Sequence, residues 1–245
     1  MIETRHSGWA HFIFRVYLSR LFKNYFHGFY IIGNIPSQDK NVPVMLLPNH
    51  NSWWDGFFIY WINRYLFKRP VYLMMLEEQL KKYSFFSRVG AYSINPDSHT
   101  GVHQSLKYTT SILQNISNPP PLVCIFPQGE LKPPMARPLG VKNGYEWIAK
   151  HSLRDMIMIP LAMKPVFLDQ QCPDVFIAFG QSFINKPGQI VEPDRLDKII
   201  TELLDRIDQN IKRGDKGTCF WEGRRSTNEK WNNFKKTIFG QGTKS

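Results

Sequence analysis

The sequence predicts a single α/β domain with a mixed, largely parallel sheet flanked by helices, plus an amphipathic helix at the N-terminus. Short apolar runs that end in polar or proline-containing turns alternate with segments of helical periodicity, which is typical of strands joined by helical crossovers. The 245 residues are enough for one domain with a substantial core. No Gly/Ser-rich linker, low-complexity stretch or internal repeat divides the chain.

Each expected element follows from its own apolar pattern. Residues 42–47 are short, apolar and followed by Pro48 and Asn49, as in a buried strand. The apolar segment 57–67 indicates a helix that either belongs to the core or lines a groove. Pro160, inside the apolar run 156–162, favours a strand end or a sheet edge. The other expected elements are a strand end at 92–95, a helix at 102–116, a strand at 122–126, a helix at 145–151, a strand at 176–179 and a helix at 194–213.

Positive charge is concentrated at both ends of a chain whose net charge is +11. Residues 1–27 carry four Lys and Arg against one acidic residue, and residues 212–245 carry nine against three. Both ends are also rich in aromatic residues, a combination that fits an anionic membrane surface or a nucleic acid. No helix-turn-helix, zinc-finger or RNP pattern is present, so we expect no nucleic-acid partner. The three cysteines match neither a disulfide framework nor a zinc site, which favours a reducing, cytosolic environment.

The N-terminal segment has the periodicity of an amphipathic helix with cations largely on its polar side. It could lie in a bilayer interface or pack on the domain's own core. Phe14 and Leu18 fall outside the main apolar stripe and widen it, which favours lipid. Charges interrupt the segment too often for a membrane span, so we expect peripheral attachment at the cytoplasmic face of the membrane. The stripe consists of Trp9, Phe12, Ile13, Val16, Tyr17, Leu21, Phe22, Tyr25 and Phe26.

The most informative motif is the run 48–56, which places His50 and Asp55 directly after the expected strand 42–47. Polar residues at the carboxyl edge of an α/β sheet often carry the chemistry of the protein. A turn would let the Asp55 carboxylate bind one imidazole nitrogen, leaving the other as a general base. The spacing alone equally fits a surface or capping pair. Ser52 lacks the G-x-S-x-G context of a nucleophile and is interpreted as a cap or an orienting hydroxyl.

Further blocks follow in a characteristic order. N-H-x-S-x-x-D at 49–55, F-P-x-G at 126–129, K-x-G at 142–144 and then an apolar strand with a central proline resemble the glycerolipid acyltransferase family, which includes the 1-acylglycerol-3-phosphate acyltransferases. The resemblance covers about residues 28–212. It leaves 1–27 as an interfacial helix and 213–245 as a basic, aromatic tail. That tail could bind phospholipid headgroups, stack on bases or pack on the domain.

The resemblance implies transfer of a fatty acyl group from acyl-CoA or an acyl carrier protein to a hydroxyl of a lipid acceptor at a membrane surface, without a cofactor or metal. His50 would be the general base and Asp55 its orienting carboxylate. Backbone amides near Gly129 are candidates to stabilise the oxyanion. The implied substrate-binding residues are Asn49, Ser52, Gln128, Gly129, Glu130, Lys132, Arg137 and Lys142.

The chain also departs from the family pattern. The usual third block is F-P-E-G-T-R, and here Gln128 replaces its glutamate and Leu131 its arginine; the second block ends at 94–96 without an arginine. Those arginines are associated with the acceptor's phosphate, which a leucine or proline cannot bind. Lys132, Arg137 and Lys142 are nearby cations that could substitute. The acceptor is therefore either a lysophospholipid or a neutral glycosylated or isoprenoid lipid, whose hydroxyls would suit Glu130.

A non-catalytic basic protein with a degenerate acyltransferase fold, binding membranes or nucleic acid, is the alternative interpretation. The loss of the arginines favours it, whereas the intact pair of His50 and Asp55 argues against it.

Overall fold

The computed structural model describes residues 1–37, 39–186, 192–224 and Trp231. Within them, a nine-stranded sheet has the order β4-β3-β5-β2-β6-β7-β1-β9, with β8 paired to β6. The strands are β1 (Gly28–Ile32), β2 (Val44–Pro48), β3 (Val71–Leu76), β4 (Ala91–Ile94), β5 (Leu122–Cys124), β6 (Met156–Val166), β7 (Asp174–Phe179), β8 (Phe183–Asn185) and β9 (Thr218–Glu222). The helices are α1 (Gly8–Tyr25), α2 (Asp55–Ile62), the π-helix η1 (Asn63–Phe67), α3 (Glu77–Lys82), the 3-10 helix η2 (Ser84–Val89), α4 (His99–Gln114), α5 (Gly144–His151) and α6 (Pro193–Lys212).

The prediction of a mixed, largely parallel sheet is confirmed. Strands β4, β3, β5, β2 and β6 run parallel to one another, and β8 is antiparallel to β6. Strand β7 is antiparallel to β6, β1 is parallel to β7, and β9 is antiparallel to β1. Because β2 lies between β5 and β6, the loops that leave the carboxyl ends of β2 and β5 lie side by side.

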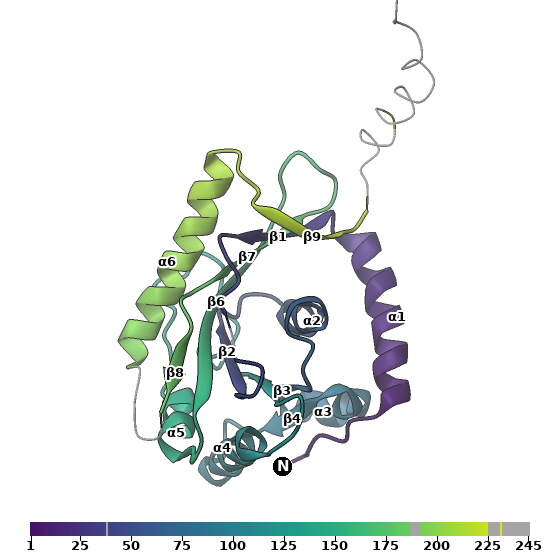
Figure 1. The fold of residues 1–245 in the computed structure, drawn as a ribbon. Coiled ribbons are helices and arrows are strands. Elements are labelled where there is room, and N and C mark those ends of the chain that lie inside the picture. The colour runs from purple at the N-terminus through teal and green to yellow at the C-terminus, as the bar shows by residue number, and fades with distance from the viewer. Residues whose placement is uncertain (38, 187–191, 225–230, 232–245) are drawn as a thin grey trace, which may run out of the picture.

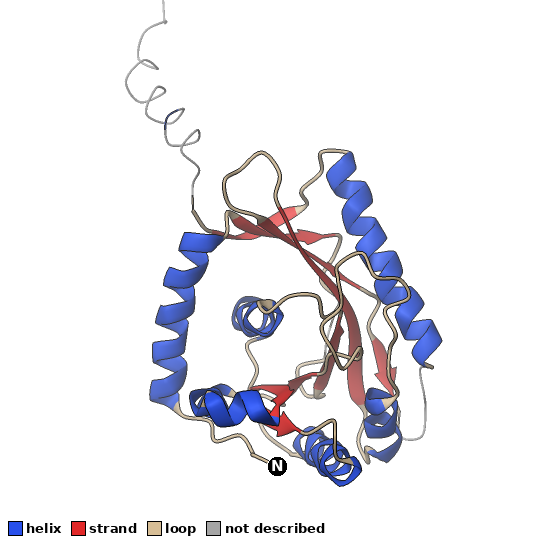
Figure 2. Cartoon of the chain, turned by 180° about the vertical axis from the view of Figure 1, so that it is seen from behind, coloured by secondary structure: helices blue, strands red, loops and turns tan. Residues whose placement is uncertain are grey.

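Two hydrophobic cores lie on opposite faces of the sheet. Successive strand residues alternate between them, so that Leu46 faces the core of α1 and α2 while Met45 faces the core of α4, α5 and α6. Figures 1 and 2 show α2 enclosed between the sheet and α1, with α6 on the other face. Residues 58–62 of α2 are buried. This helix is therefore part of the core, and within the expected segment 57–67 only Phe57, Arg64, Tyr65 and Leu66 are exposed or partly exposed.

Helix α1 packs on the domain through residues spaced four apart. Ala10, Phe14, Leu18 and Phe22 are buried against the core. The expected stripe was therefore misplaced, because Phe14 and Leu18 form the packed face instead of widening a lipid-facing one. Most of that stripe lies on the outer face of α1 and is exposed. Among the described residues, no helix is both long and apolar enough to cross a bilayer.

Strand β6 corrects the expectation for Pro160. This proline lies inside a central strand and pairs in register with Leu47 of β2. On its other side, β6 pairs with β8 up to Met158 and with β7 from Leu161 onward. Pro160 therefore falls where the strand changes partner, and its missing N–H costs no ladder hydrogen bond there.

The sheet extends beyond residue 212. Strand β9 pairs with β1, and Trp221 packs on Phe29 with ring centroids 5.3 Å apart. Part of the expected tail thus completes the sheet. Several cationic and aromatic residues of the expected tail lie outside the described residues: Arg225, Phe234, Lys235, Lys236 and Phe239.

Candidate active site

His50 lies two residues beyond the end of β2, and Asp55 is the first residue of α2. The intervening turn brings the two side chains together, with His50 Nδ1 2.9 Å from Asp55 Oδ2. The expected contact is therefore formed. With the imidazole neutral, Nδ1–H donates to the carboxylate and Nε2 carries the lone pair. The His50 side chain remains 23% exposed, so that a ligand can reach it.

Asp55 is fully buried and its carboxylate accepts three further hydrogen bonds. Oδ2 accepts from the backbone N–H groups of Asn51 at 2.8 Å and Ser52 at 2.9 Å, and Oδ1 accepts from the Ser52 hydroxyl at 2.6 Å. These donors satisfy the buried charge and fix the carboxylate beneath the imidazole. Ser52 also accepts from the N–H of Trp54 at 3.2 Å. Ser52 therefore orients the Asp55 carboxylate, one of the two roles, cap or orienting hydroxyl, that the sequence pattern favoured over a nucleophile, while its expected contact with substrate stays a prediction.

Phe126 supports the imidazole from the adjacent loop. Its ring stacks on His50 with centroids 4.0 Å apart and an interplanar angle of 22°. No role for Phe126 was predicted from the sequence, although this residue opens the F-P-x-G block that follows β5. Phe126 follows β5, and β5 is next to β2 in the sheet. This neighbouring position of the two strands is the information that would have predicted the contact with His50.

Asn49 and Gln128 are structural in this site, although both were expected to bind substrate. Each is buried, and each uses its side-chain amide to hold one residue's backbone. Asn49 Oδ1 accepts from Met163 N–H at 2.7 Å and Nδ2 donates to Met163 C=O at 3.0 Å. Gln128 Oε1 accepts from His50 N–H at 2.6 Å and Nε2 donates to His50 C=O at 3.3 Å. The structure thus commits both amides to the protein's own main chain.

Three polar residues that were expected to bind substrate, Glu130, Lys132 and Lys142, lie in the segment between β5 and α5. The Lys132 N–H donates to His50 C=O at 3.0 Å, and Lys132 Nζ is 3.7 Å from Glu130 Oε1. The Lys142 side chain lies against Gly129, with Nζ 3.2 Å from the position that a Cβ would occupy there. Two lysines and a carboxylate therefore lie in the loop region whose main chain contacts the His50 carbonyl.

The structure limits the roles of two further residues of this loop. The Gly129 N–H donates to Phe126 C=O at 3.0 Å, so the amides near Gly129 that were expected to stabilise the oxyanion are its neighbours, such as that of Glu130. The Arg137 guanidinium donates to the carbonyls of Pro134 at 3.1 Å and Ala136 at 2.8 Å. Arg137 therefore stabilises its own loop in this structure.

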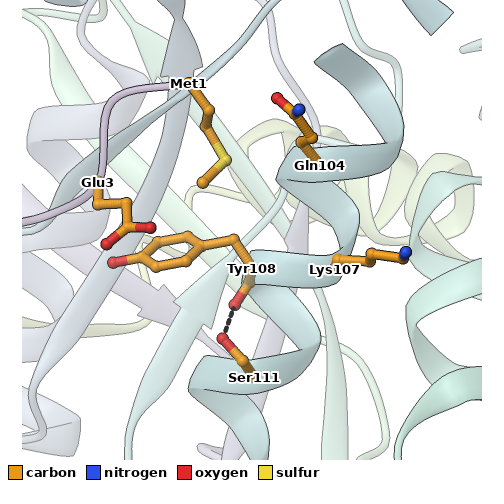
Figure 3. Close-up of a pocket in the computed structure, with 6 residues that line it drawn as sticks. All are labelled: Met1, Glu3, Gln104, Lys107, Tyr108 and Ser111. Atoms are coloured by element: carbon orange, nitrogen blue, oxygen red, sulfur yellow. Dashed lines mark hydrogen bonds between the residues drawn. The ribbon is translucent and has the colours of Figure 1, made fainter. Parts of the chain in front are cut away.

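A separate depression of about 520 Å³ lies between the N-terminal segment and α4 (Figure 3). Ser111 Oγ donates to the backbone carbonyl of Tyr108 there, at 2.8 Å. No residue of the His50 site lines this depression, so we do not assign it to the chemistry. Its lining residues are Met1, Glu3, Gln104, Lys107, Tyr108 and Ser111.

A histidine oriented by a buried carboxylate therefore lies at the carboxyl end of a central parallel strand, and both residues belong to the N-H-x-S-x-x-D block. The chain matches the family model described as Acyltransferase over residues 29–164, more than half of its length, and therefore belongs to the acyltransferase family. This confirms the prediction of an acyltransferase.

The fold is similar to that of PlsC, the 1-acyl-sn-glycerophosphate (LPA) acyltransferase from Thermotoga maritima. The TM-score is 0.53 at 16% sequence identity, over 82% of this chain and 79% of that chain. At this identity the likeness shows the fold. No curated protein matches the sequence.

Proposed function

We propose that the protein transfers a fatty acyl group from a thioester, acyl-CoA or acyl carrier protein, to a hydroxyl of a lipid acceptor, with His50 as the general base. The observation that carries this proposal is the 2.9 Å contact between His50 Nδ1 and the fully buried Asp55 carboxylate. It selects the tautomer whose Nε2 can accept a proton, which is the state that a general base requires.

The proposed reaction needs no covalent enzyme intermediate, because the thioester is already activated. His50 Nε2 takes the proton of the acceptor hydroxyl as its oxygen attacks the thioester carbonyl and forms the new C–O bond. The positive charge that develops on the imidazole is stabilised by Asp55, which lies on the opposite side of the ring. When the C–S bond breaks, the imidazolium returns the proton to the departing thiolate. The products are an ester and a free thiol.

We propose that the acceptor is either a lysophospholipid or a lipid with a neutral hydroxyl, such as a glycolipid or a glycosylated isoprenoid. Leu131 replaces the family's arginine and its side chain is exposed, so this position lacks a bidentate phosphate fork. The Glu130 carboxylate near Lys132 Nζ partly offsets that cation and can accept hydrogen bonds from sugar hydroxyls. Lys142 remains the better placed of the cations for a phosphate, because its ammonium lies against Gly129.

An acceptor screen with mass spectrometry tests the proposal. Purified protein is supplied with one acyl thioester and, in parallel, lysophosphatidate, other lysophospholipids, glycolipids and glycosylated isoprenoids. We expect one acylated lipid and one free thiol per turnover. The absence of both with every acceptor would favour the non-catalytic alternative. A strong preference for lysophosphatidate would refute the neutral acceptor while leaving the acyl transfer intact.

We further propose that the outer face of α1 attaches the protein peripherally to the cytoplasmic face of a membrane. Phe12 is 60% exposed and Ile13 is 50% exposed, and the guanidinium of Arg15 lies 6.0 Å from the Phe12 ring centroid. Bulky apolar side chains beside cations suit an anionic bilayer interface. Trp53, in the loop between His50 and Asp55, is 64% exposed, and its ring contacts Trp54, which contacts Tyr25 of α1.

Vesicle flotation tests this attachment. Deleting α1 would remove Phe14, Leu18 and Phe22 from the core, so surface substitutions are the sharper test. We expect the double variant Phe12→Glu/Ile13→Glu to lose binding to anionic vesicles. The matched control is Ile116→Glu/Leu153→Glu, which adds the same charge at exposed apolar residues outside α1 and should bind like wild type. Equal binding by both double variants would refute the role of α1.

A further inference from the structure

Gln128 contacts the candidate base through the main chain. Its side chain is buried, and its amide spans the backbone of His50, accepting from the N–H at 2.6 Å and donating to the C=O at 3.3 Å. The same carbonyl also accepts from the Lys132 N–H at 3.0 Å. The backbone of His50 is therefore fixed by the loop that follows β5, in addition to its place after β2.

The loop that follows β5 holds both parts of His50. Phe126 stacks on the imidazole, and Gln128, two residues later, holds the backbone of the same residue. Asp55 fixes the rotation of the ring through Nδ1. With backbone, ring plane and ring rotation all set, the position of Nε2 is determined before any substrate arrives. Such preorganisation matters because a displacement of about 1 Å can cost a rate factor on the order of 10².

An amide is the side chain that can make both contacts. An ionised glutamate, the residue of the family's usual block, has only acceptor oxygens. It could accept from the His50 N–H, but it would face the His50 carbonyl with a second oxygen and leave that carbonyl to Lys132 alone. Gln128 supplies the acceptor and the donor together, so its replacement of the family's glutamate strengthens the hold on His50.

We propose that Gln128 is a positioning residue for the general base: its amide holds the His50 main chain so that Nε2 meets the acceptor hydroxyl. This inference rests on the proposed acyl transfer. It assigns Gln128 an effect on turnover and none on substrate binding.

The chain offers a matched control in Asn63. Its amide makes the same two contacts with the backbone of Arg69, accepting from the N–H at 3.2 Å and donating to the C=O at 2.8 Å, and it is also buried. Asn63 opens η1, outside the loops that contact His50. Gln128→Met and Asn63→Leu therefore each remove one buried amide that holds one backbone, and only the first removes it from His50.

The test measures kcat, the KM of donor and acceptor, and the thermal midpoint for wild type, Gln128→Met, Gln128→Glu and Asn63→Leu, with the thioester and the acceptor that wild type uses. We expect kcat of Gln128→Met to fall by about 10²-fold with both KM values within about twofold of wild type. Gln128→Glu keeps one of the two contacts, so its kcat should lie between the kcat of wild type and that of Gln128→Met. Asn63→Leu should lower the thermal midpoint and keep the wild-type kcat.

Three results would overturn the inference: a wild-type kcat in Gln128→Met, an equal loss of kcat in Asn63→Leu, or a loss that appears in KM alone. If Gln128→Met does not fold, a wild-type kcat in Gln128→Glu would overturn it equally. A wild-type protein that acylates no acceptor would instead overturn the proposed function, so the two failures are distinguishable.

Discussion

Replacing Asp55 by asparagine isolates the charge of the carboxylate from its hydrogen bonds. The asparagine oxygen can take the place of Oδ2 and accept from His50 Nδ1 and from the N–H groups of Asn51 and Ser52. Its amide nitrogen then takes the place of Oδ1 and donates to the Ser52 hydroxyl, which lies 2.6 Å away in wild type. The variant can therefore keep the fold and the imidazole tautomer while losing the negative charge.

The expected loss follows from the distance between the charges. With His50 Nδ1 2.9 Å from Asp55 Oδ2, the charge centres of an imidazolium and the carboxylate are separated by about 4 Å. Unit charges at that separation attract by about 4 kcal/mol in an effective dielectric of about 20. Because the imidazolium develops during attack, this attraction lowers the barrier, and its removal corresponds to roughly 10³-fold in rate.

The assay compares kcat/KM for ester formation in wild type and Asp55→Asn, with thermal unfolding to confirm the fold. Asp174→Asn is a matched control, because Asp174 is also buried and bonded to a histidine, with His27 Nδ1 2.6 Å from its Oδ1. That pair joins the residue before β1 to the first residue of β7, away from the candidate site. We expect Asp174→Asn to lose stability and keep its turnover. A rate for Asp55→Asn within tenfold of wild type would refute the charge argument.

Three further outcomes are expected. Phe126→Leu should lower kcat by about 3- to 10-fold, because the stacked ring against His50 contributes roughly 0.5–1.5 kcal/mol, and an unchanged kcat would contradict its supporting role. Asn49→Leu should cost about 2–4 kcal/mol of unfolding free energy in urea denaturation, since it leaves the buried N–H and C=O of Met163 without this partner, and a loss under 1 kcal/mol would be inconsistent with that role. Partial desolvation and the neighbouring His11 lower the pKa of His6, which remains exposed at the surface, from 6.5 to about 4, so the unfolded chain binds a proton that the folded chain excludes. Stability should therefore fall as pH drops from 6.5 to 4, with a shallower slope in His6→Asn, and identical slopes would refute this assignment.

The helices and strands that have a clear apolar pattern could be predicted from the sequence. The strand before His50, the helices after Asp55 and at 194–213, and the parallel centre of the sheet follow from apolar periodicity and turn residues. Strand β1 was not predicted, because it follows α1 within one continuous apolar and aromatic stretch where periodicity cannot separate a helix from a strand. The packed face of α1 was misplaced for a related reason. Apolar residues occupy more than one side of that helix, and only tertiary contacts decide which side is buried.

The site could be predicted only in part. The contact between His50 and Asp55 is local, so that spacing and turn chemistry indicated it. The roles of Asn49 and Gln128 depend on residues more than 75 positions away, Met163 and His50. A buried amide that holds a backbone has the same donors and acceptors as one that holds a substrate, and one sequence does not distinguish them. The neighbouring positions of β5, β2 and β6 in the sheet supply the missing information.

The most direct test of the central claim is the rate of acyl-ester formation by His50→Ala, with wild type and His103→Ala measured alongside. His103 is an exposed histidine on α4, outside the candidate site, and controls for the substitution itself. If Nε2 of His50 takes the proton from the acceptor hydroxyl, the folded His50→Ala protein forms ester at least about 10²-fold more slowly than wild type, and His103→Ala matches wild type. Ester formation by folded His50→Ala at the wild-type rate would contradict the assignment of His50 as the base.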